Sequence, residues 1–239
     1  IQAIKGVSFE VNEGEVIALI GANGAGKTTA FNMLTGVYRP TDGTIMLDGK
    51  SLVGKKPAEI CQEGVARTFQ NIRLWKSMTV FDNVIIAKHM RAKHNVFSST
   101  FRISRKEEAR MREETEALLR EQGLWQHRDA LATGLPYGLQ RRLEIARALA
   151  TEPKLLLLDE PAAGMNPQET LELADFIHEI RDKHHLTILL IEQNANMALK
   201  IADLAYVLET GTITMSGTGA ELLADEKVKE AYLGKKRGK

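Results

Sequence analysis

The sequence lacks most of the features that mark secreted, membrane-spanning or nucleic-acid-binding proteins. Its one cysteine, Cys61, cannot form a disulfide within the chain and is typical of a reducing compartment. No apolar run approaches the ~18 residues that a membrane-spanning helix needs, and the first residues lack the basic and apolar regions of a signal peptide. The formal net charge of +1 gives no electrostatic argument for binding nucleic acid. These absences predict a cytoplasmic protein that reaches any membrane through a partner.

What the sequence does contain is an alternation of strand-like and helix-like segments. The continuous apolar run at Val16 to Ile20 is typical of a strand buried on both faces, and strand signals return at 155–158 and 187–191. The last two flank a helical pattern over about 168–183. Strands that alternate with helices predict a mainly parallel sheet, and 239 residues suffice for one α/β core with a small inserted subdomain.

Other strand signals predict an antiparallel β portion. Residues 205–208 and 212–215 flank a Thr-Gly turn and are typical of a hairpin. Ile45 to Leu47 leads into Asp48-Gly49, which favours a strand that enters a tight turn. The alternation of apolar and polar residues from Val7 to Val11 favours a further strand.

Residues from about 72 to 150 differ in character and predict a helical subdomain inserted into a single domain of residues 1–239. Arg105 to Gln122 is rich in Glu, Arg, Ala and Leu. Its sparse apolar positions, among them Met111 and Leu118, are typical of an exposed amphipathic helix. The predicted fold class is therefore α/β, with a mainly parallel sheet, an antiparallel portion and this inserted helical subdomain.

Residues 21–28 form a glycine-rich loop between a buried strand and a helix over 27–35, and they match G-x-x-x-x-G-K-[ST] in full. Glycines let the backbone fold around phosphate with its N–H groups inward, and the helix N-terminus adds a favourable partial charge. Lys27 is expected to reach the β- and γ-phosphates of ATP, Thr28 to offer its hydroxyl to Mg²⁺, and Thr29 to bind the α-phosphate. The loop predicts a phosphate-loop ATPase core whose nucleotide-binding residues are Gly21, Asn23, Gly24, Ala25, Gly26, Lys27, Thr28 and Thr29.

An apolar strand at Leu155 to Leu158 ends in two carboxylates, Asp159 and Glu160. Successive side chains on a strand point to opposite faces, so the two acids are expected to do different work. Asp159 is suited to hold the Mg²⁺ shell, and Glu160 to polarise the attacking water as a general base. An ordinary polar strand end is the alternative, which the nearby phosphate loop disfavours.

Three further segments complete a pattern that resembles the ATP-binding-cassette proteins over essentially the whole chain. Leu135 to Leu143 is similar to the signature segment of that family, Gln70 to its Q-loop glutamine, and Ala163 to Asn166 to its D-loop. Together with the phosphate loop and the acidic strand end, these motifs occur in the family's order, which makes the resemblance highly specific.

The resemblance implies that two such subunits enclose two ATP molecules head to tail, each with Mg²⁺. Tyr137 and Gly138 of one subunit would close on the γ-phosphate held by the other, because backbone N–H groups at a helix start suit anionic oxygens. Gln70 would touch Mg²⁺ or the attacking water, so the implied metal-binding residues are Thr28, Gln70 and Asp159.

The resemblance also implies partners and a place in the cell. The partners are a second cassette subunit, identical or a sister, and membrane permease subunits at the inner face of the bacterial plasma membrane. Residues 71–80, including Trp75, would lie near a permease subunit, and ordinary packing within the protein is the alternative for Trp75.

Within the family, the stretches 65–70, 141–147 and 159–167 resemble the ATPases of the high-affinity branched-chain amino acid importer. Most of the chain resembles its LivG type of subunit, whereas the residues from about Ile191 onward and the first four residues resemble its LivF type. The sequence therefore suggests a hybrid of two related subunits. Alternatives are the ATPase of another transporter such as lipopolysaccharide export, a soluble ATP-driven switch, and a weakly active cassette.

Three departures from the family pattern predict reduced hydrolysis. Gln193 stands where the family has a switch histidine, and its amide can bond the γ-phosphate but cannot carry a proton. The implied catalytic residues are therefore Glu160, Gln193 and Gln70. Pro136 replaces the signature serine and removes a hydroxyl and an N–H. The aromatic residue that stacks on adenine would lie upstream of Ile1, and losing ~1–3 kcal/mol of stacking would weaken nucleotide affinity.

Overall fold

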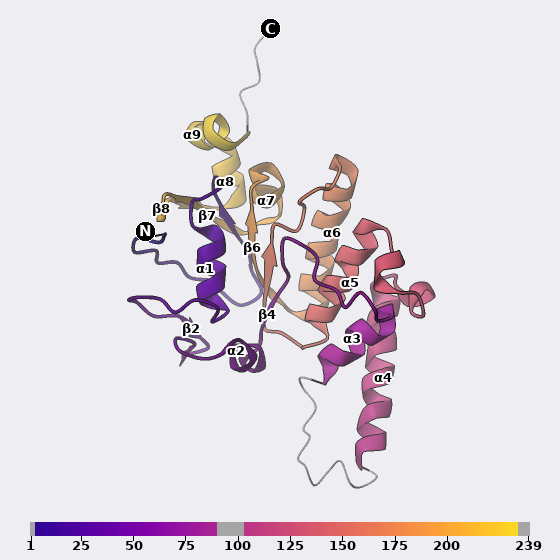
Figure 1. Cartoon of the computed structure of the whole chain (residues 1–239). Coiled ribbons are helices and arrows are strands. Elements are labelled where there is room, and N and C mark those ends of the chain that lie inside the picture. Colours follow the sequence, from indigo (N-terminus) through magenta and orange to yellow (C-terminus); the bar gives the residue numbers. More distant parts are fainter. Residues whose placement is uncertain (1–2, 90–102, 234–239) are drawn as a thin grey trace. The chain divides into compact units, whose positions relative to one another are not determined.

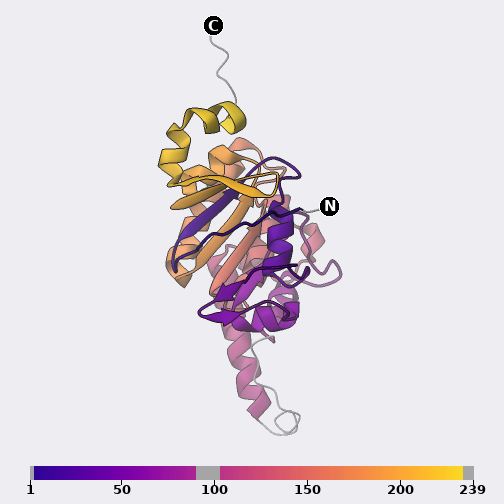
Figure 2. The ribbon, with the colours of Figure 1, turned by 90° about the vertical axis from the view of Figure 1, so that its left-hand side faces the viewer.

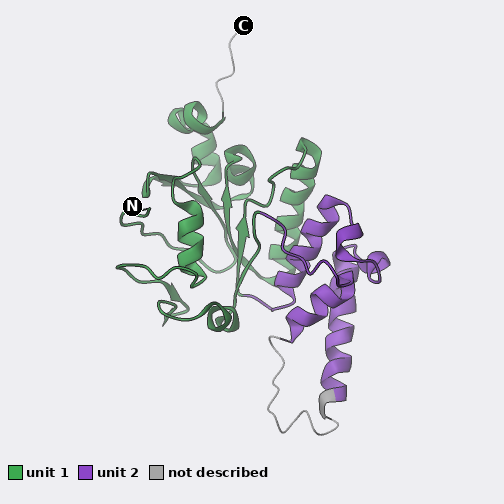
Figure 3. Cartoon of the chain, viewed as in Figure 1, with its two compact units in different colours: residues 1–70, 154–239 green, residues 71–153 purple. Residues whose placement is uncertain are grey.

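The computed structural model describes residues 3–89 and 103–233. The chain divides into two compact units (Figure 3). Unit 1 comprises residues 1–70 and 154–239, and unit 2 comprises residues 71–153. Residues 90–102 of the expected helical subdomain, and Ile1 and Gln2 of the opening segment, lie outside the described residues.

Unit 1 is built on a six-stranded sheet whose strands are β1 (Val16–Ile20), β4 (Val65–Arg67), β5 (Leu155–Asp159), β6 (Thr187–Glu192), β7 (Leu204–Glu209) and β8 (Thr212–Gly217). The strand order is β4-β5-β6-β1-β7-β8 (Figure 1). All neighbouring pairs are parallel except β7 and β8, which form the antiparallel hairpin. This arrangement confirms the predicted α/β fold class with a mainly parallel sheet and antiparallel strands.

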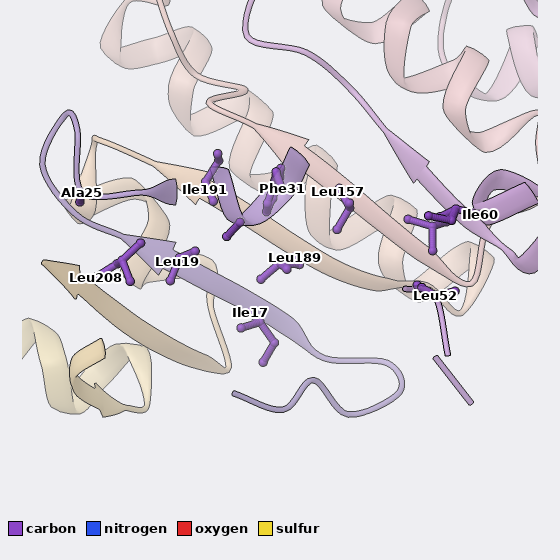
Figure 4. Packing of buried hydrophobic residues seen from close by; sticks show 12 residues of the cluster. Ile17, Leu19, Ala25, Phe31, Leu52, Ile60, Leu157, Leu189, Ile191 and Leu208 are labelled. Atoms are coloured by element: carbon purple, nitrogen blue, oxygen red, sulfur yellow. The ribbon is translucent and has the colours of Figure 1, made fainter. Parts of the chain in front are cut away.

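Helix α1 (Lys27–Leu34) packs against one face of this sheet. Its residue Phe31 is fully buried in a cluster with Leu19, Leu157 and Leu189, which come from three neighbouring strands (Figure 4). Fully burying an apolar side chain of this size contributes roughly 1.5–3 kcal/mol. The packing fixes the helix that follows the phosphate loop firmly against the strands that carry the acidic residues.

The opposite face of the sheet is covered as well. Buried residues such as Ala18 and Leu190 alternate with those that face α1, and α7 (Ala195–Ile201) contacts both β1 and β6. Helix α6 (Pro167–His184) begins at a capping box formed by Asn166 and contacts α7. Because β1, β5 and β6 are parallel, their carboxyl ends meet at one edge of the sheet, where ligands bind in open α/β sheets.

The remaining small elements of unit 1 extend this core. Strands β2 (Met46–Leu47) and β3 (Lys50–Ser51) form a short antiparallel hairpin, and α2 (Pro57–Glu63) leads into β4. Beyond the hairpin of β7 and β8, the chain continues through α8 (Gly219–Ala224), α9 (Glu226–Val228) and a π-helical turn, η4 (Lys229–Leu233) (Figure 2). Helix α8 contacts α7 and both strands of the hairpin.

The expectation of a strand from Val7 to Val11 is wrong, because the segment belongs to no strand of the structure and none of the described strands pairs with it. Its apolar side chains nevertheless pack against the core, and the ring of Phe9 lies 5.4 Å from that of Tyr206. The alternation in the sequence therefore reports burial of one side of an extended segment, which does not require a hydrogen-bonded partner strand.

Unit 2 is helical. Helix α3 (Val80–Lys88) packs against both α4 (Ile103–Glu121) and α5 (Tyr137–Leu149), and two short 3₁₀ helices, η2 (Trp125–His127) and η3 (Ala132–Gly134), join the latter two. Buried Met111 and Leu118 belong to the apolar stripe of α4. In the described parts of both units, no helix combines the length and the apolar character that crossing a membrane requires.

Candidate nucleotide site

The phosphate loop connects the buried strand β1 to helix α1 in unit 1. Gly24 and Gly26 adopt φ values of 80° and 108°, a region that glycine enters without steric cost. A Cβ on Gly26 would lie 2.8 Å from the carbonyl oxygen of Ala3, and a Cβ on Gly21 would lie 2.3 Å from that of Leu208. Backbone conformation therefore requires glycine at position 24, close packing requires it at position 21, and both reasons apply at position 26.

Lys27 lies buried at the start of α1 and turns back toward the loop. Its Nζ donates to the carbonyl oxygens of Gly21 at 2.7 Å and Ala22 at 3.1 Å. Burial lowers the pKa of the Lys27 ammonium, and the nearby carboxylates of Glu160, Glu192 and Asp159 act in the opposite direction. A curved loop with an ammonium group beside it and a helix N-terminus below it fits a bound phosphate chain.

The hydroxyl-bearing residues of the motif lie in the first turn of α1. Thr28 is exposed and Thr29 is partly buried. The Thr28 hydroxyl and a carboxylate such as Asp159 are hard oxygen donors of the kind that Mg²⁺ prefers. Across residues 3–89 and 103–233, no group of three or more His, Cys, Asp or Glu side chains could hold a metal ion by itself.

Asp159 is the last residue of β5 and is buried. Its Oδ2 accepts a hydrogen bond from Nη2 of Arg67 at 2.6 Å. Its backbone N–H donates to the hydroxyl of Thr68 at 3.4 Å. The first carboxylate of the acidic pair is thus held inside the protein by residues of and after the neighbouring strand β4.

The expectation that Glu160 continues the strand is wrong. The strand ends at Asp159, and Glu160 has φ 44°, in the left-handed region. Its N–H still donates to the carbonyl oxygen of Ile191 at 2.9 Å, while its own carbonyl accepts from Ala163 at 3.1 Å to close a turn. The two acids point in different directions because the backbone turns at Glu160, rather than because a strand alternates.

Gln70 and Glu160 come together near this turn. Nε2 of Gln70 donates to Oε2 of Glu160 at 2.7 Å. Glu160 also lines a pocket of about 320 Å³, whose other residues are Ala162, Ala163, Glu192, Gln193 and Asn194. The structure therefore brings together Glu160, Gln193 and Gln70, the three residues that the sequence implies as catalytic, at the carboxyl edge of the sheet.

The sequence reasoning missed the roles of two charged residues at this edge, Arg67, whose side chain is 7% exposed, and Glu192, which is buried. Glu192 ends β6, and its carboxylate accepts from the backbone N–H groups of Ala162 at 2.9 Å and Asn194 at 3.3 Å. Burial raises the pKa of Glu192, although its backbone hydrogen bonds act against that shift. An acid that directly follows the apolar run 187–191 was a signal of the same kind as Asp159 after Leu158.

Tyr137 and Gly138 begin helix α5 and belong to unit 2, so the structure describes them within that unit alone. Tyr137 is exposed and Gly138 is partly exposed, and a Cβ built on Gly138 would meet nothing within 4 Å beyond its chain neighbours and the backbone of its own helix. One turn further on, Arg141 and Glu144 form a buried ion pair at 2.7 Å. The exposed first residues of α5 are thus followed by a turn that is fixed inside the protein by a buried ion pair.

A family model described as "ABC transporter" matches residues 4–163. The chain belongs to this family. It is 46% identical over 238 residues to the high-affinity branched-chain amino acid transport ATP-binding protein LivG of Salmonella typhimurium, covering 97% of this chain and 92% of the relative. LivG of Escherichia coli K12 is 44% identical with the same coverage. The lipopolysaccharide export ATP-binding protein LptB of Haemophilus influenzae is 33% identical and covers 98% of this chain and 91% of its own.

Solved structures agree with the family. A crystal structure of an ATP-binding cassette of an ABC transporter in its ADP conformation has a TM-score of 0.82 at 31% identity, covering 98% of this chain and 93% of the other. A nucleotide-free cassette has a TM-score of 0.81 at 33% identity with the same coverage. The matches to LivG bear out the resemblance that the sequence indicated. They span both ends of the chain without separating them, so the hybrid origin stays a prediction.

Proposed function

We propose that this chain binds and hydrolyses ATP to power the import of branched-chain amino acids through partner membrane permease subunits. The observation that carries the proposal is the convergence of the phosphate loop, Lys27, Asp159 and Glu160 at one edge of the sheet in unit 1. The cargo rests on the identity of 44–46% with LivG proteins. The more distant likeness to LptB makes lipopolysaccharide export the weaker alternative.

We assign ATP to the loop through its backbone N–H groups from Gly21 to Gly26, with Lys27 on the β- and γ-phosphates and Thr29 on the α-phosphate. Lys27 is already directed toward the loop by two carbonyl oxygens. Thr28, Gln70 and Asp159 would hold Mg²⁺, which neutralises the charge that develops on the phosphate oxygens. Their oxygen donors suit this cation.

Glu160 is the proposed general base. Its carboxylate takes a proton from the attacking water, which then bonds to the γ-phosphorus and yields ADP and phosphate. The hydrogen bond of 2.7 Å from Gln70 supports this role, because it fixes one oxygen of the Glu160 carboxylate and keeps the Gln70 amide beside it. Gln193, an exposed residue that lines the same pocket, would donate its amide to the γ-phosphate.

A second cassette subunit, identical or a sister, would supply the open start of its helix α5 at Tyr137 and Gly138 to the γ-phosphate. The 13-residue helix that begins at Tyr137 favours an anion at its N-terminal end. The segment 71–80 would face a permease subunit at the inner side of the plasma membrane. Trp75 supports this placement because 41% of its surface is exposed while Arg147 stacks on its ring at 4.3 Å.

The test is ATP hydrolysis and leucine uptake in vesicles that contain the chain together with the permease subunits of a branched-chain amino acid importer. We expect amino acid on the uptake side to stimulate hydrolysis, and Lys27→Ala to abolish both activities. Lys183→Ala, which removes an exposed lysine from α6, is the matched control and should change neither. Hydrolysis that responds to lipopolysaccharide export partners instead would replace the cargo, and hydrolysis that responds to no permease would overturn the proposal.

A further inference from the structure

Arg67, the last residue of β4, joins a residue 92 positions away in the sequence. Nη2 of Arg67 donates to Oδ2 of Asp159 at 2.6 Å, and the two side chains are 7% and 6% exposed. Arg67 pairs in register with Leu157 on the parallel neighbour β5, two residues before Asp159. Since side chains two apart share a face of a strand, the sheet itself directs the guanidinium toward the carboxylate.

The other side of the guanidinium is fixed to the helix after the phosphate loop. Nη1 of Arg67 donates to Oδ1 of Asn32 at 2.7 Å and to Oγ1 of Thr35 at 3.3 Å. Its central carbon lies 5.5 Å from the ring centre of Phe31 and 5.0 Å from that of Phe69. One buried cation therefore connects α1, the end of β5 and the segment that leads to Gln70.

The surroundings of this ion pair fix the orientation of the two side chains more than they add to the stability of the fold. Taking both charges out of water costs free energy that their attraction returns only when geometry and further hydrogen bonds are good. The planar guanidinium supplies several donors in a rigid fork, so its contacts to α1 hold it while one donor holds Asp159. Asp159 thus has a buried counter-charge and a defined position without any metal ion.

We propose that Arg67 is a positioning residue that neutralises Asp159 and holds its carboxylate in place until a divalent cation arrives with the nucleotide. The inference rests on the proposed role of Asp159 as a metal ligand. A cation that approaches this carboxylate alone meets the positive charge of Arg67 at close range, and like charges repel strongly in a buried setting. The negative charge of the phosphates offsets that repulsion, so Arg67 makes cation binding depend on nucleotide.

The experiment measures binding of Mn²⁺ to the nucleotide-free protein by electron paramagnetic resonance, in the wild type and in Arg67→Met. We expect the variant to bind Mn²⁺ at least about tenfold more tightly, because the competing charge is gone and the carboxylate of Asp159 lacks a counter-charge. Its melting temperature should fall by roughly 6–20 °C. Added Mg²⁺ should restore part of that loss in the variant and leave the wild type almost unchanged.

Two further variants separate the charge from the packing of the side chain. Arg67→Met combined with Asp159→Asn removes both charges, and it should recover melting temperature relative to Arg67→Met while losing the response to Mn²⁺. If Arg67→Met fails to fold, the double variant must fold, since its buried site is neutral. A double variant that also fails to fold would overturn the inference, because packing and not charge would then explain the role of Arg67.

Lys154→Met is the matched control for loss of a paired cation. Lys154 forms an ion pair with Asp48, and their side chains are 63% and 57% exposed. Exposed pairs contribute little, so Mn²⁺ binding should not change. Equal Mn²⁺ affinity in wild type and Arg67→Met would sink the inference while ATP hydrolysis by the wild type still supports the proposed function. Absence of nucleotide binding by the wild type would instead overturn the function.

Discussion

The ends of β5 and β6 are neighbours in the sheet and carry the same pattern, a buried acid followed by a more exposed polar residue. At β5 the buried acid is Asp159, held by the guanidinium of Arg67 at 2.6 Å. At β6 it is Glu192, held by the backbone N–H groups of Ala162 and Asn194. Similar sequences at two strand ends therefore bury a carboxylate in two different ways.

This difference separates the roles of the two strand ends. A carboxylate that a guanidinium holds in a defined orientation suits a metal ligand. A carboxylate held by two amides, with its pKa raised by burial, joins the turn after Glu160 to the start of α7. We infer that Asp159 at the end of β5 takes part in the chemistry, whereas Glu192 at the end of β6 maintains the shape of the pocket.

The largest effect should follow a change at the second residue of the β5 end. Glu160→Gln keeps the size of the side chain and removes the general base, so hydrolysis should fall about 10²–10⁴-fold. Nucleotide binding should remain, because Glu160 does not hold the phosphates. Single-turnover hydrolysis measured beside nucleotide titration checks both. A loss of less than tenfold would place the base elsewhere and would break the contrast between the two strand ends.

The next effect is on stability at the first residue of the β5 end. Asp159→Asn leaves the buried guanidinium of Arg67 without its carboxylate, and removing one partner of a buried pair costs up to about 3–5 kcal/mol. The Glu192 carboxylate accepts its hydrogen bonds from the backbone N–H groups of Ala162 and Asn194 rather than from a guanidinium, so Glu192→Gln should cost far less. Urea unfolding of both variants without nucleotide compares them, and equal losses would contradict the distinction.

The β6 end should show itself in the pH dependence of stability. Burial raises the pKa of Glu192 above its ordinary value of 4.5, so folding favours the protonated form. That stability is fully present below pH 4.5 and is lost as pH rises through the folded-state pKa. Glu192→Gln removes this pH-dependent loss. The difference in free energy of unfolding, variant minus wild type, should therefore increase from acid to neutral pH. Parallel curves from urea unfolding across that range would show that Glu192 is not shifted.

The smallest effect concerns Gln193, the second residue of the β6 end. Gln193→His restores a group that can carry a proton, and it should raise hydrolysis by roughly tenfold or less, equal to ~1.4 kcal/mol or less in the barrier. Gln193→Ala, which removes the amide, should lower the rate. Steady-state hydrolysis of the three proteins measures the series. Identical rates would count against any role for this position.

Much of this edge could be predicted because its signals are local. The phosphate loop is a continuous motif, and the apolar runs that end at Ile20, Leu158 and Ile191 indicate parallel strands by composition alone. The mainly parallel sheet followed from their alternation with helices. What a contiguous pattern cannot give is contact between distant segments, which is why the pairing of Arg67 with Asp159 was missed.

Backbone conformation was the second limit. Nothing in the composition of residues 155–160 requires Glu160 to leave the strand with φ 44°, because that turn depends on contacts with Ile191 and Ala163. The short strand β4 has three residues, too few for a periodic signal, although it carries Arg67. At Val7 to Val11 the reverse occurred, since a clear alternation reflects packing against the core rather than strand pairing.

The most direct test of the central claim, a nucleotide site completed by a second subunit, is the mass of Glu160→Gln with and without Mg²⁺ and ATP. Slow hydrolysis should trap the closed state, so analytical ultracentrifugation should show a monomer without nucleotide and a dimer with it, either of this chain or with a sister cassette. Gly138→Asp, which places a negative charge at the start of α5, should abolish the dimer. A mass that does not change with nucleotide, in the presence or absence of a sister subunit, would contradict the account.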